Sequence, residues 1–324
     1  MSPSNLHLID LQPKADDFLG DVERGFNAPS KYLLPKYIYD AAGSQCFDEI
    51  CQTNDYYLTR VERSIMKQLG VINLDTSKPV AVVELGGASS TKFRELLKHL
   101  THVQLYMPVD ISKELLNAEA EQLAADIPDL QVKAICADYQ QLADFPWREH
   151  LEGMTPLLFF PGSTVGNLSM KDTHALMDIC RTIVGDEGYM LMGADLVKDE
   201  QVLIRAYSDS EKVTERFNLN ILHRMNRDLG GDIHVGQFRH EVRYNQAKKK
   251  IDIYLVSNID QTVHIAGKAY NFKKDEPIYT ESSRKFERSD IEALAGAHGL
   301  KLTEWWTDAR DYFSVSLLKS VPLS

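Results

Sequence analysis

Three acidic residues lie where successive apolar runs end, at positions from which an α/β sheet could hold a ligand. Glu84 lies in VVEL, Asp110 closes YMPVD and Asp138 follows AICA. In open α/β sheets, ligands bind outside the carboxyl ends of the strands. Each acid taken singly is also typical of a helix cap, but three in succession favour a binding site. We therefore predict a ligand site at this edge of the sheet.

The turn after the first of these acids narrows the kind of ligand. Gly86 and Gly87 would let a ligand approach the backbone closely. The turn has neither the G-x-G-x-x-G spacing of dinucleotide sites nor the G-x-x-x-x-G-K-[ST] loop of nucleoside triphosphate sites. Asp110 lies 110 − 84 = 26 residues after Glu84, a separation from the Gly-rich turn at which an acid can accept hydrogen bonds from ribose hydroxyls. Asp138 and Tyr139 could face an adenine. An adenosine group without a polyphosphate indicates S-adenosylmethionine, and hence methyl transfer.

The stretch FFPGSTVGNL, residues 159–168, leaves an apolar run abruptly. Two Phe residues end an expected strand, and the small residues of a Pro161-Gly162 turn would make room for an incoming ligand. The backbone carbonyl of this turn and Asn167 could bind the amine and the carboxylate of a substrate. The alternative is a tight turn whose Asn caps the following helix.

A parallel sheet is needed to bring these residues together, and the sequence predicts one. Short β-branched or aromatic runs alternate with helical patterns between about residues 60 and 200, as in βαβ units. The runs are nearly all apolar, as expected where helices cover both faces of a sheet. Strands are expected at 80–85, 103–109, 132–136, 157–160 and 189–194, and helices at 91–100, 113–125 and 171–184.

From about residue 200 to 283 the pattern changes to that of an inserted α+β lobe. A helix is expected at 213–229, followed by a Gly-Gly break and by alternating strands such as KIDIYLVS. In that strand Ile251, Ile253 and Leu255 share one face, which is typical of a half-buried antiparallel strand.

The last part of the chain predicts a helix and two closing strands. Ser289 is the expected N-cap of the helix and Gly299 its stop. The strands are expected in KLTEWWTD and YFSVSLLKS.

Composition excludes several classes of function. The 324 residues carry a formal net charge of -11, and the basic runs 248–250 and 273–274 are expected to be solvated turns, so we expect no nucleic-acid partner. The four cysteines form no C-x-x-C pair and the ten histidines no metal-ligand spacing, so no metal is expected. The sequence shows no secretory signal and no run of about 18 apolar residues, which predicts a cytoplasmic protein without membrane contact. Nothing in it indicates an obligatory protein partner.

A series of longer motifs runs along the chain from about residue 20. They are PKYIYDAAGSQCFDEICQTNDYYLTRVE (35–62), VVELGGASSTK (82–92), PVDIS, CADY, FFPGSTVGNL, GADLVKDEQVLIRAYSD (193–209), YTESSRKF (279–286) and EWWTDARDYFSVSL (304–317). Together they resemble the histidine-specific Nα-methyltransferases, which convert histidine to its trimethyl betaine, hercynine, in ergothioneine biosynthesis.

The resemblance implies an α/β protein with a Rossmann-like class I methyltransferase sheet and a second α+β lobe formed by the N-terminal segment and an insertion. Residues 1–60 would be the N-terminal part of the substrate-binding lobe and 61–199 the S-adenosylmethionine-binding domain. Residues 200–286 would be the inserted part of the lobe, and 287–324 the return to the methyltransferase domain.

The resemblance also implies which residues form the site. For S-adenosylmethionine it implies Gly86, Lys92, Asp110, Asp138 and Tyr139. For the small-molecule substrate, L-histidine, it implies Tyr56, Gly162, Asn167, Tyr207, Glu281 and Ser283, of which Tyr56, Tyr207 and Asn167 are the catalytic candidates.

The types of these residues suit the reaction. Methyl transfer needs a neutral amine and ends in a quaternary cation, which the ring faces of Tyr56 and Tyr207 would attract. Their hydroxyls could also take or relay the amine proton. Glu281 and Ser283 would project from one side of an extended segment, so the pair could accept from one imidazole nitrogen and donate to the other.

Three other functions remain to be separated from this one. The same architecture could methylate another amino acid, such as tryptophan or tyrosine. A non-catalytic regulator that binds S-adenosylmethionine would need Asp110 and Asp138 but not Tyr56, Asn167 and Tyr207. A nicotinamide oxidoreductase is disfavoured by the incomplete glycine pattern.

Overall fold

The computed structural model describes residues 3–13, 17–74, 77–87 and 89–321. The chain forms two compact units. The sheet unit comprises Met1–Lys14, Val61–Leu196 and Phe286–Ser324, and the second unit comprises Ala15–Arg60 and Val197–Lys285. Each unit is therefore built from segments that are far apart in the sequence.

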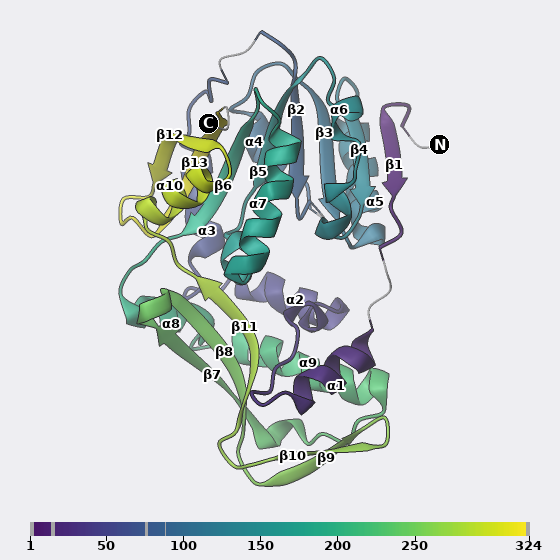
Figure 1. Ribbon diagram of the computed structural model, residues 1–324, viewed down its shortest axis with the longest axis vertical. Helices are drawn as coiled ribbons and strands as arrows, with labels where there is room; N and C mark the ends of the chain where they lie inside the picture. Colours follow the sequence, from purple (N-terminus) through teal and green to yellow (C-terminus); the bar gives the residue numbers. More distant parts are fainter. Residues whose placement is uncertain (1–2, 14–16, 75–76, 88, 322–324) are drawn as a thin grey trace. The chain divides into compact units, whose positions relative to one another are not determined.

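An eight-stranded sheet forms the centre of the sheet unit, with strand order β1-β4-β3-β2-β5-β6-β13-β12 (Figure 1). The six strands from β1 to β6 pair in parallel, and β13 pairs antiparallel with both β6 and β12. The order confirms the predicted α/β class with a mainly parallel sheet. The strands are β1 (Leu6–Asp10), β2 (Val80–Leu85), β3 (Val103–Asp110), β4 (Gln131–Cys136), β5 (Thr155–Phe160), β6 (Tyr189–Asp195), β12 (Leu300–Thr307) and β13 (Phe313–Ser320).

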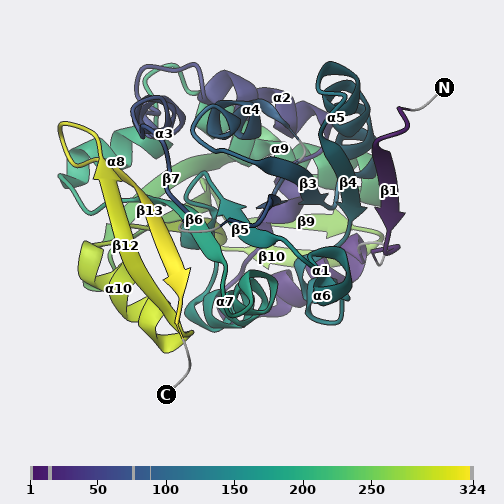
Figure 2. The same ribbon diagram turned by 90° about the horizontal axis from the view of Figure 1, so that it is seen from above.

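Helices cover both faces of this sheet, which explains why its central strands are mostly apolar. Figure 2 shows α3, α4 and α5 on one face and α6, α7 and α10 on the other. These helices are α3 (Leu58–Met66, within the sheet unit from Val61), α4 (Thr91–Leu97), α5 (Lys113–Asp126), α6 (Trp147–His150), α7 (Met170–Val184) and α10 (Arg288–Ala297). Two short 3₁₀ helices, η2 (Tyr139–Ala143) and η3 (Thr164–Asn167), follow the ends of β4 and β5.

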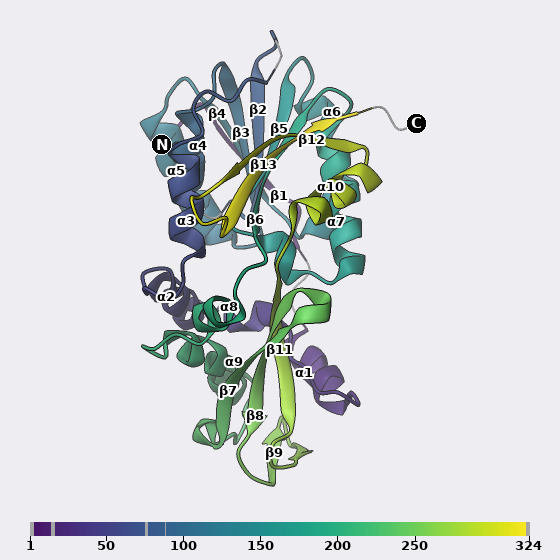
Figure 3. The same ribbon diagram turned by 90° about the vertical axis from the view of Figure 1, so that its left-hand side faces the viewer.

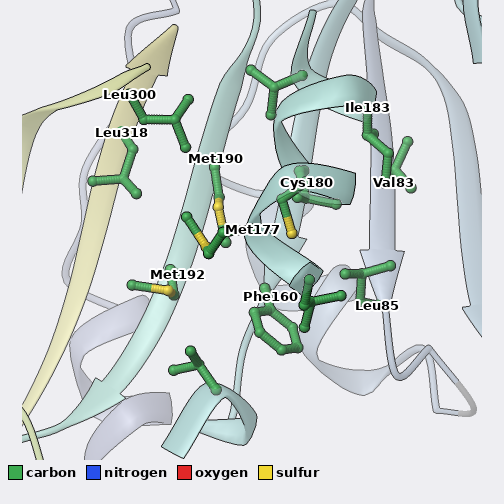
Figure 4. Packing of buried hydrophobic residues seen from close by; sticks show 14 of the residues in the cluster. Val83, Leu85, Phe160, Met177, Cys180, Ile183, Met190, Met192, Leu300 and Leu318 are labelled. Atoms are coloured by element: carbon green, nitrogen blue, oxygen red, sulfur yellow. The ribbon is translucent and has the colours of Figure 1, made fainter. Parts of the chain in front are cut away.

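The core between the sheet and α7 contains several sulfur-containing side chains. Met190 and Met192 of β6 meet Met177 and Cys180 of α7, and Phe160 ends β5 beside them (Figure 4). All five are at most 1% exposed, and burying a side chain of this size contributes about 1.5–3 kcal/mol. This packing fixes the end of β5, and with it the start of the turn at Pro161.

The N-terminal strand corrects the predicted segment boundaries. Residues 1–60 were expected in the second lobe, but β1 pairs in parallel with β4 and belongs to the sheet unit. The amide of Asn5 holds it there by donating to the backbone carbonyls of Ala124 and Leu130, at 3.1 and 2.7 Å. The run LHLID is too short for its pattern to reveal which sheet it joins, because edge strands depend on such distant contacts.

The N-cap predicted for α10 is also wrong. Ser289 lies inside the helix, and Glu287 precedes its first residue. The carboxylate of Asp290 accepts a hydrogen bond of 2.8 Å from the Glu287 N–H, so an acid three residues on ties down the helix start. Gly299 adopts φ +66 directly before β12 and so ends the helical segment as predicted.

The second unit combines helices with an antiparallel sheet of order β11-β8-β7 and a two-stranded sheet of β9 and β10 (Figure 3). Ile251, Ile253 and Leu255 of β8 are all buried, as their shared face predicts. The strands are β7 (Phe238–Asn245), β8 (Lys250–Ser257), β9 (Gln261–Ile265), β10 (Lys268–Phe272) and β11 (Pro277–Arg284). The helices are α1 (Phe18–Asn27), α2 (Ala41–Ile50), α8 (Glu200–Tyr207) and α9 (Val213–Leu229), with the 3₁₀ turns η1 (Pro35–Ile38), η4 (Val235–Gln237) and η5 (Gln246–Lys248).

No helix among the described residues combines the length and apolar character needed to span a membrane.

Candidate active site

The Gly-rich turn after β2 is tied to the end of β3. The N–H groups of Gly86 and Gly87 both donate to the carbonyl of Val109, at 2.9 and 3.1 Å. Gly86 adopts φ +80, and a Cβ on Gly87 would lie only 2.7 Å from the Cβ of Pro108. Only glycine fits both positions without strain, so the sequence pair is explained by the closeness of β2 and β3.

Glu84, the acid at the end of β2, is sealed inside the sheet unit. It is 1% exposed, and its carboxyl accepts a hydrogen bond of 2.6 Å from the hydroxyl of Tyr106, whose ring stacks on Phe93. Burial raises the pKa of Glu84 to about 8, although the Tyr106 hydrogen bond opposes this. Glu84 thus links β2 to β3, and the acids nearer to solvent are Asp110 and Asp138.

Of the other two acids, Asp110 is the last residue of β3, and Asp138 follows β4 together with Tyr139. Asp110 is half-buried and accepts a hydrogen bond of 2.9 Å from the Ser112 N–H. Asp138 is exposed and caps η2, because its carboxylate accepts a hydrogen bond of 2.8 Å from the Gln140 N–H. The helix-capping role considered as an alternative for these acids is therefore present at Asp138. Tyr139 reaches back toward the Gly-rich turn, because its hydroxyl lies 3.6 Å from where a Gly86 Cβ would be.

The turn after β5 is held by Glu62, a residue that no sequence pattern singled out. Glu62 of α3 accepts a 2.6 Å hydrogen bond from the Gly162 N–H and forms a 2.8 Å ion pair with Lys92. Its side chain is 3% exposed, and a Cβ on Gly193 would lie 2.2 Å from its Oε1. Gly193 therefore leaves the space through which Glu62 joins Gly162 to Lys92, two residues predicted for different ligands.

The same turn has an unusual backbone. Gly162 adopts φ +82, and Ser163 follows in the left-handed region at φ +58. The hydroxyl of the buried Ser163 accepts 2.9 Å from the Asp195 N–H, which fixes this conformation against the end of β6. Asn167 ends η3 with an exposed side chain. The N-cap of α7 is Ser169, so the alternative that Asn167 caps this helix is wrong.

Two tyrosines predicted to act in catalysis meet inside the second unit. Tyr56 and Tyr207 are 8% and 9% exposed, with ring centroids 6.0 Å apart in an edge-to-face arrangement. Burial raises the pKa of Tyr56 well above its ordinary value, so at neutral pH its phenol is uncharged. The pair offers aromatic surface of the kind that attracts alkylated ammonium groups.

A buried lysine joins the predicted polar residues of the second unit. Lys285, which is 0% exposed, donates to the hydroxyls of Tyr207 and Ser283 at 2.9 and 2.8 Å. Those two hydroxyls are themselves 2.8 Å apart. Burial raises the pKa of Glu281 to about 7, and the positive charge of Lys285 opposes that rise. A cation, an acid and two hydroxyls therefore share one interior region of this unit.

The predicted substrate residues thus fall into two groups. Gly162 and Asn167 belong to the sheet unit, and the remaining four belong to the second unit. Sequence reasoning missed Glu62 and Lys285, although both lie within quoted motifs, at the end of the first motif and in YTESSRKF. A lone charged residue carries no signal of burial, because most such residues are exposed. Among the described residues, no group of three or more His, Cys, Asp or Glu side chains could hold a metal ion.

Comparison with known proteins identifies the family to which the chain is similar. The family model described as "Histidine-specific methyltransferase, SAM-dependent" matches residues 18–320. The histidine N-alpha-methyltransferase of Mycolicibacterium smegmatis is 33% identical over 327 residues, which cover 98% of this chain and 99% of that protein. The protein of that name from Mycobacterium tuberculosis is also 33% identical, with 92% and 93% covered.

Solved structures that match this chain include the CcbJ methyltransferase from Streptomyces caelestis. It has a TM-score of 0.44 and 14% sequence identity, with 81% of this chain and 89% of that chain covered.

Proposed function

The chain belongs to the histidine-specific, S-adenosylmethionine-dependent methyltransferase family, and from this premise we propose that it trimethylates the α-amino nitrogen of L-histidine to give hercynine. It is an enzyme that uses S-adenosylmethionine and acts on a small molecule. The observation that supports histidine as the substrate is the presence of Glu281 and Ser283 two residues apart in β11, since these side chains can bind both nitrogens of an imidazole. Hercynine formation is the first step of ergothioneine biosynthesis, and proteins named "Ergothioneine biosynthesis protein 1" are among the relatives.

The sheet unit would hold the methyl donor. Asp110 would accept hydrogen bonds from the ribose hydroxyls and Asp138 from the adenine amino group, with Tyr139 against the adenine ring. The Gly86 turn fits a ligand that has no phosphates, because its N–H groups already donate to Val109. Lys92 would contribute to the binding site of the methyl donor through its ion pair with Glu62.

The second unit would hold the imidazole and the growing ammonium group. Glu281 and Ser283 would bind the ring, while Tyr56 and Tyr207 would face the amine as it gains methyl groups. Asn167 and the Gly162 turn of the sheet unit would bind the amino and carboxylate groups. The buried environment of the tyrosines supports this role, because cation–π attraction is stronger away from water.

S-adenosylmethionine supplies one methyl group per transfer, whose bond to sulfur breaks as its bond to nitrogen forms. The residues of this chain must keep the amine unprotonated at the moment of attack. Converting an ammonium to a trimethylammonium releases three protons in all, and the hydroxyls of Tyr56 and Tyr207 would pass them toward solvent. Correct positioning of the amine lone pair supplies much of the acceleration.

Mass spectrometry of histidine incubated with the enzyme and S-adenosylmethionine tests this proposal. Products carrying one, two and three added methyl groups are expected. Parallel incubations with tryptophan and tyrosine separate the enzyme from one that methylates another amino acid. Absence of any methyl release from labelled S-adenosylmethionine, despite tight binding, would instead indicate a regulator.

We also propose that the enzyme works in the cytoplasm without an obligatory protein partner and without binding nucleic acid. The net charge of -11 supports the last point, because phosphate groups bind basic surfaces. Activity of the purified enzyme alone, with light scattering to show that no second protein is present, tests for a required partner. Activity that appears only after a second protein is added would contradict this view.

A further inference from the structure

The hydroxyl of Ser283 lies between two donors. Lys285 follows β11 directly, and Tyr207 is the last residue of α8. The lysine Nζ is 2.8 Å from Ser283 Oγ and 2.9 Å from Tyr207 Oη, and it lies 4.6 Å from the centroid of the Tyr207 ring. All three residues are buried. Each bond of this cluster is therefore formed away from competing water.

The chemistry of these groups fixes the direction of each bond. An ammonium group can only donate, so both hydroxyl oxygens accept from Lys285. A phenol is the better donor of the two hydroxyls, and Tyr207 accordingly donates to Ser283 at 2.8 Å. Ser283 Oγ then accepts two hydrogen bonds, which occupy its two lone pairs. What Ser283 can still offer a ligand is its own O–H.

Glu281 supplies the opposite polarity. Glu281 and Ser283 pair with Ile253 and Ile251 of β8 without a shift in register between them, so their side chains project from the same face of β11. An ionised Glu281 can only accept. A neutral imidazole carries one acceptor nitrogen and one N–H, which matches a donating Ser283 and an accepting Glu281. An imidazolium carries two N–H groups, and one of them would meet a hydroxyl that cannot accept.

We propose that Lys285 is a positioning residue that fixes Ser283 as a donor, so that the enzyme binds the neutral histidine ring and rejects the imidazolium. This role deepens the proposed function and rests on it, because it assumes that Glu281 and Ser283 bind the ring. The positive charge of Lys285 acts in the same sense, since it would repel a cationic ring nearby.

Several titratable groups belong to this cluster or surround it, and they contribute to any pH dependence. They are Glu281 of β11, Lys285, Tyr207 of α8, Tyr56, Cys51, Tyr39 and His240 of β7, whose Nε2 lies 2.7 Å from the Tyr207 carbonyl. Burial raises the pKa of Tyr56 and lowers that of His240, so both stay uncharged near neutral pH. Glu281, with a pKa of about 7, titrates in the same range as the ligand ring.

The test therefore compares the dissociation constants of two ligands. Titration of Glu281 affects both constants alike and cancels in their ratio. Dissociation constants of histidine and of 1,2,4-triazolylalanine, whose ring stays neutral, are measured by calorimetry on enzyme saturated with S-adenosylhomocysteine. The ratio of the histidine value to the triazole value should rise about tenfold between pH 7.5 and pH 5.5, because an imidazole of pKa about 6.5 becomes largely protonated. A flat ratio in the unaltered enzyme would overturn the proposal without any variant.

Variants then assign this selection to Lys285. In Lys285→Met the ratio should change less than about threefold, since Ser283 is free to accept from an imidazolium N–H. The matched control is Lys250→Met, which removes a lysine 2.6 Å from Asp252 and 5.4 Å from the Tyr279 ring centroid in the same unit. It should keep the tenfold change. A tenfold change retained in folded Lys285→Met would overturn the role of Lys285, while production of methylated histidine by the unaltered enzyme would leave the proposed function standing. Failure of the unaltered enzyme to bind histidine at all would contradict the proposed function itself.

Discussion

The two units position their candidate residues by different means. In the sheet unit, Asp110 ends one parallel strand, and Asp138 and Tyr139 follow the end of the next, so the topology of an α/β sheet places all three. In the second unit, Tyr207 and Ser283 come from segments far apart in sequence and are joined through Lys285. A general nucleoside site can be built from strand ends and turns, whereas recognition of one side chain needs a closed network of polar groups.

The broadest test of this difference separates the two ligands by substitution. Glu281→Ala should lower kcat/KM for histidine about 100-fold, because it removes a charge-assisted hydrogen bond, and should leave the dissociation constant of S-adenosylmethionine unchanged. Asp110→Ala should show the reverse pattern in the same calorimetric and kinetic assays. Equal loss of cofactor affinity in both variants, with histidine affinity intact, would contradict the assignment of Asp110 to the cofactor and of Glu281 to histidine.

The link between Gly162 and Lys92 can be broken at Glu62. Glu62→Gln keeps an acceptor for the Gly162 N–H but removes the charge that faces Lys92, so we expect about tenfold slower methyl transfer. Glu187→Gln is the control in the same unit, because its ion pair with Lys78 is exposed and contributes little. Initial rates at saturating substrates compare the two, and equal rates would mean that the turn does not depend on Glu62.

Backbone conformation at the turn after β5 gives a smaller effect. Gly162→Ala would place a Cβ at φ +82 and 3.0 Å from the Lys92 Nζ, and should slow the reaction severalfold. Gly153→Ala is the control in the same unit, because it also places a Cβ at positive φ, +75, but with open space around it. Both should lose about 1 kcal/mol of unfolding free energy in denaturant titrations, but only Gly162→Ala should slow catalysis. A comparable loss of activity in Gly153→Ala would point to general destabilisation.

The smallest expected effect concerns stability and pH. The folded pKa of Glu84 is about 8, above its unfolded value, so the folded sheet unit binds more protons between about pH 4.5 and 8. This group therefore lowers stability as pH rises through that window. Glu84→Gln keeps an acceptor for Tyr106 and should reduce the fall in melting temperature between pH 5 and 8 by a few degrees. An unchanged slope would show that burial of Glu84 does not set it.

Sequence patterns were sufficient for most of the sheet and for the position of its acidic residues near the strand ends. Runs such as VVEL and YMPVD are mostly buried, so their apolar composition marks β2 and β3, and the acid within each run stands near the end of its strand. The edge strand β1 was not foreseen in the sheet, because its place depends on contacts of Asn5 with Ala124 and Leu130 far along the chain. Local composition cannot encode such a contact.

The candidate residues of the second unit could be proposed from the sequence only through resemblance to a family. Tyr56 and Tyr207 have no spacing that predicts their edge-to-face contact, and Lys285 looks like any surface lysine next to an arginine. Its burial follows from tertiary packing, which places its ammonium against two hydroxyls. Charged residues become buried when such partners satisfy them, and one of the two partners here, Tyr207, lies 78 residues away in the sequence.

The position of β13 between β6 and β12 has a consequence for how the enzyme is made. On the ribosome, β6 emerges long before β13, and the whole stretch Val197–Lys285 is synthesised in between. Until β13 arrives, a nascent chain carries β6, with seven residues that are all buried in the finished protein, as an open sheet edge. Crowded polysomes and fast translation should therefore favour mispairing between unfinished copies, and chaperones that shield apolar strands should raise the yield of active enzyme.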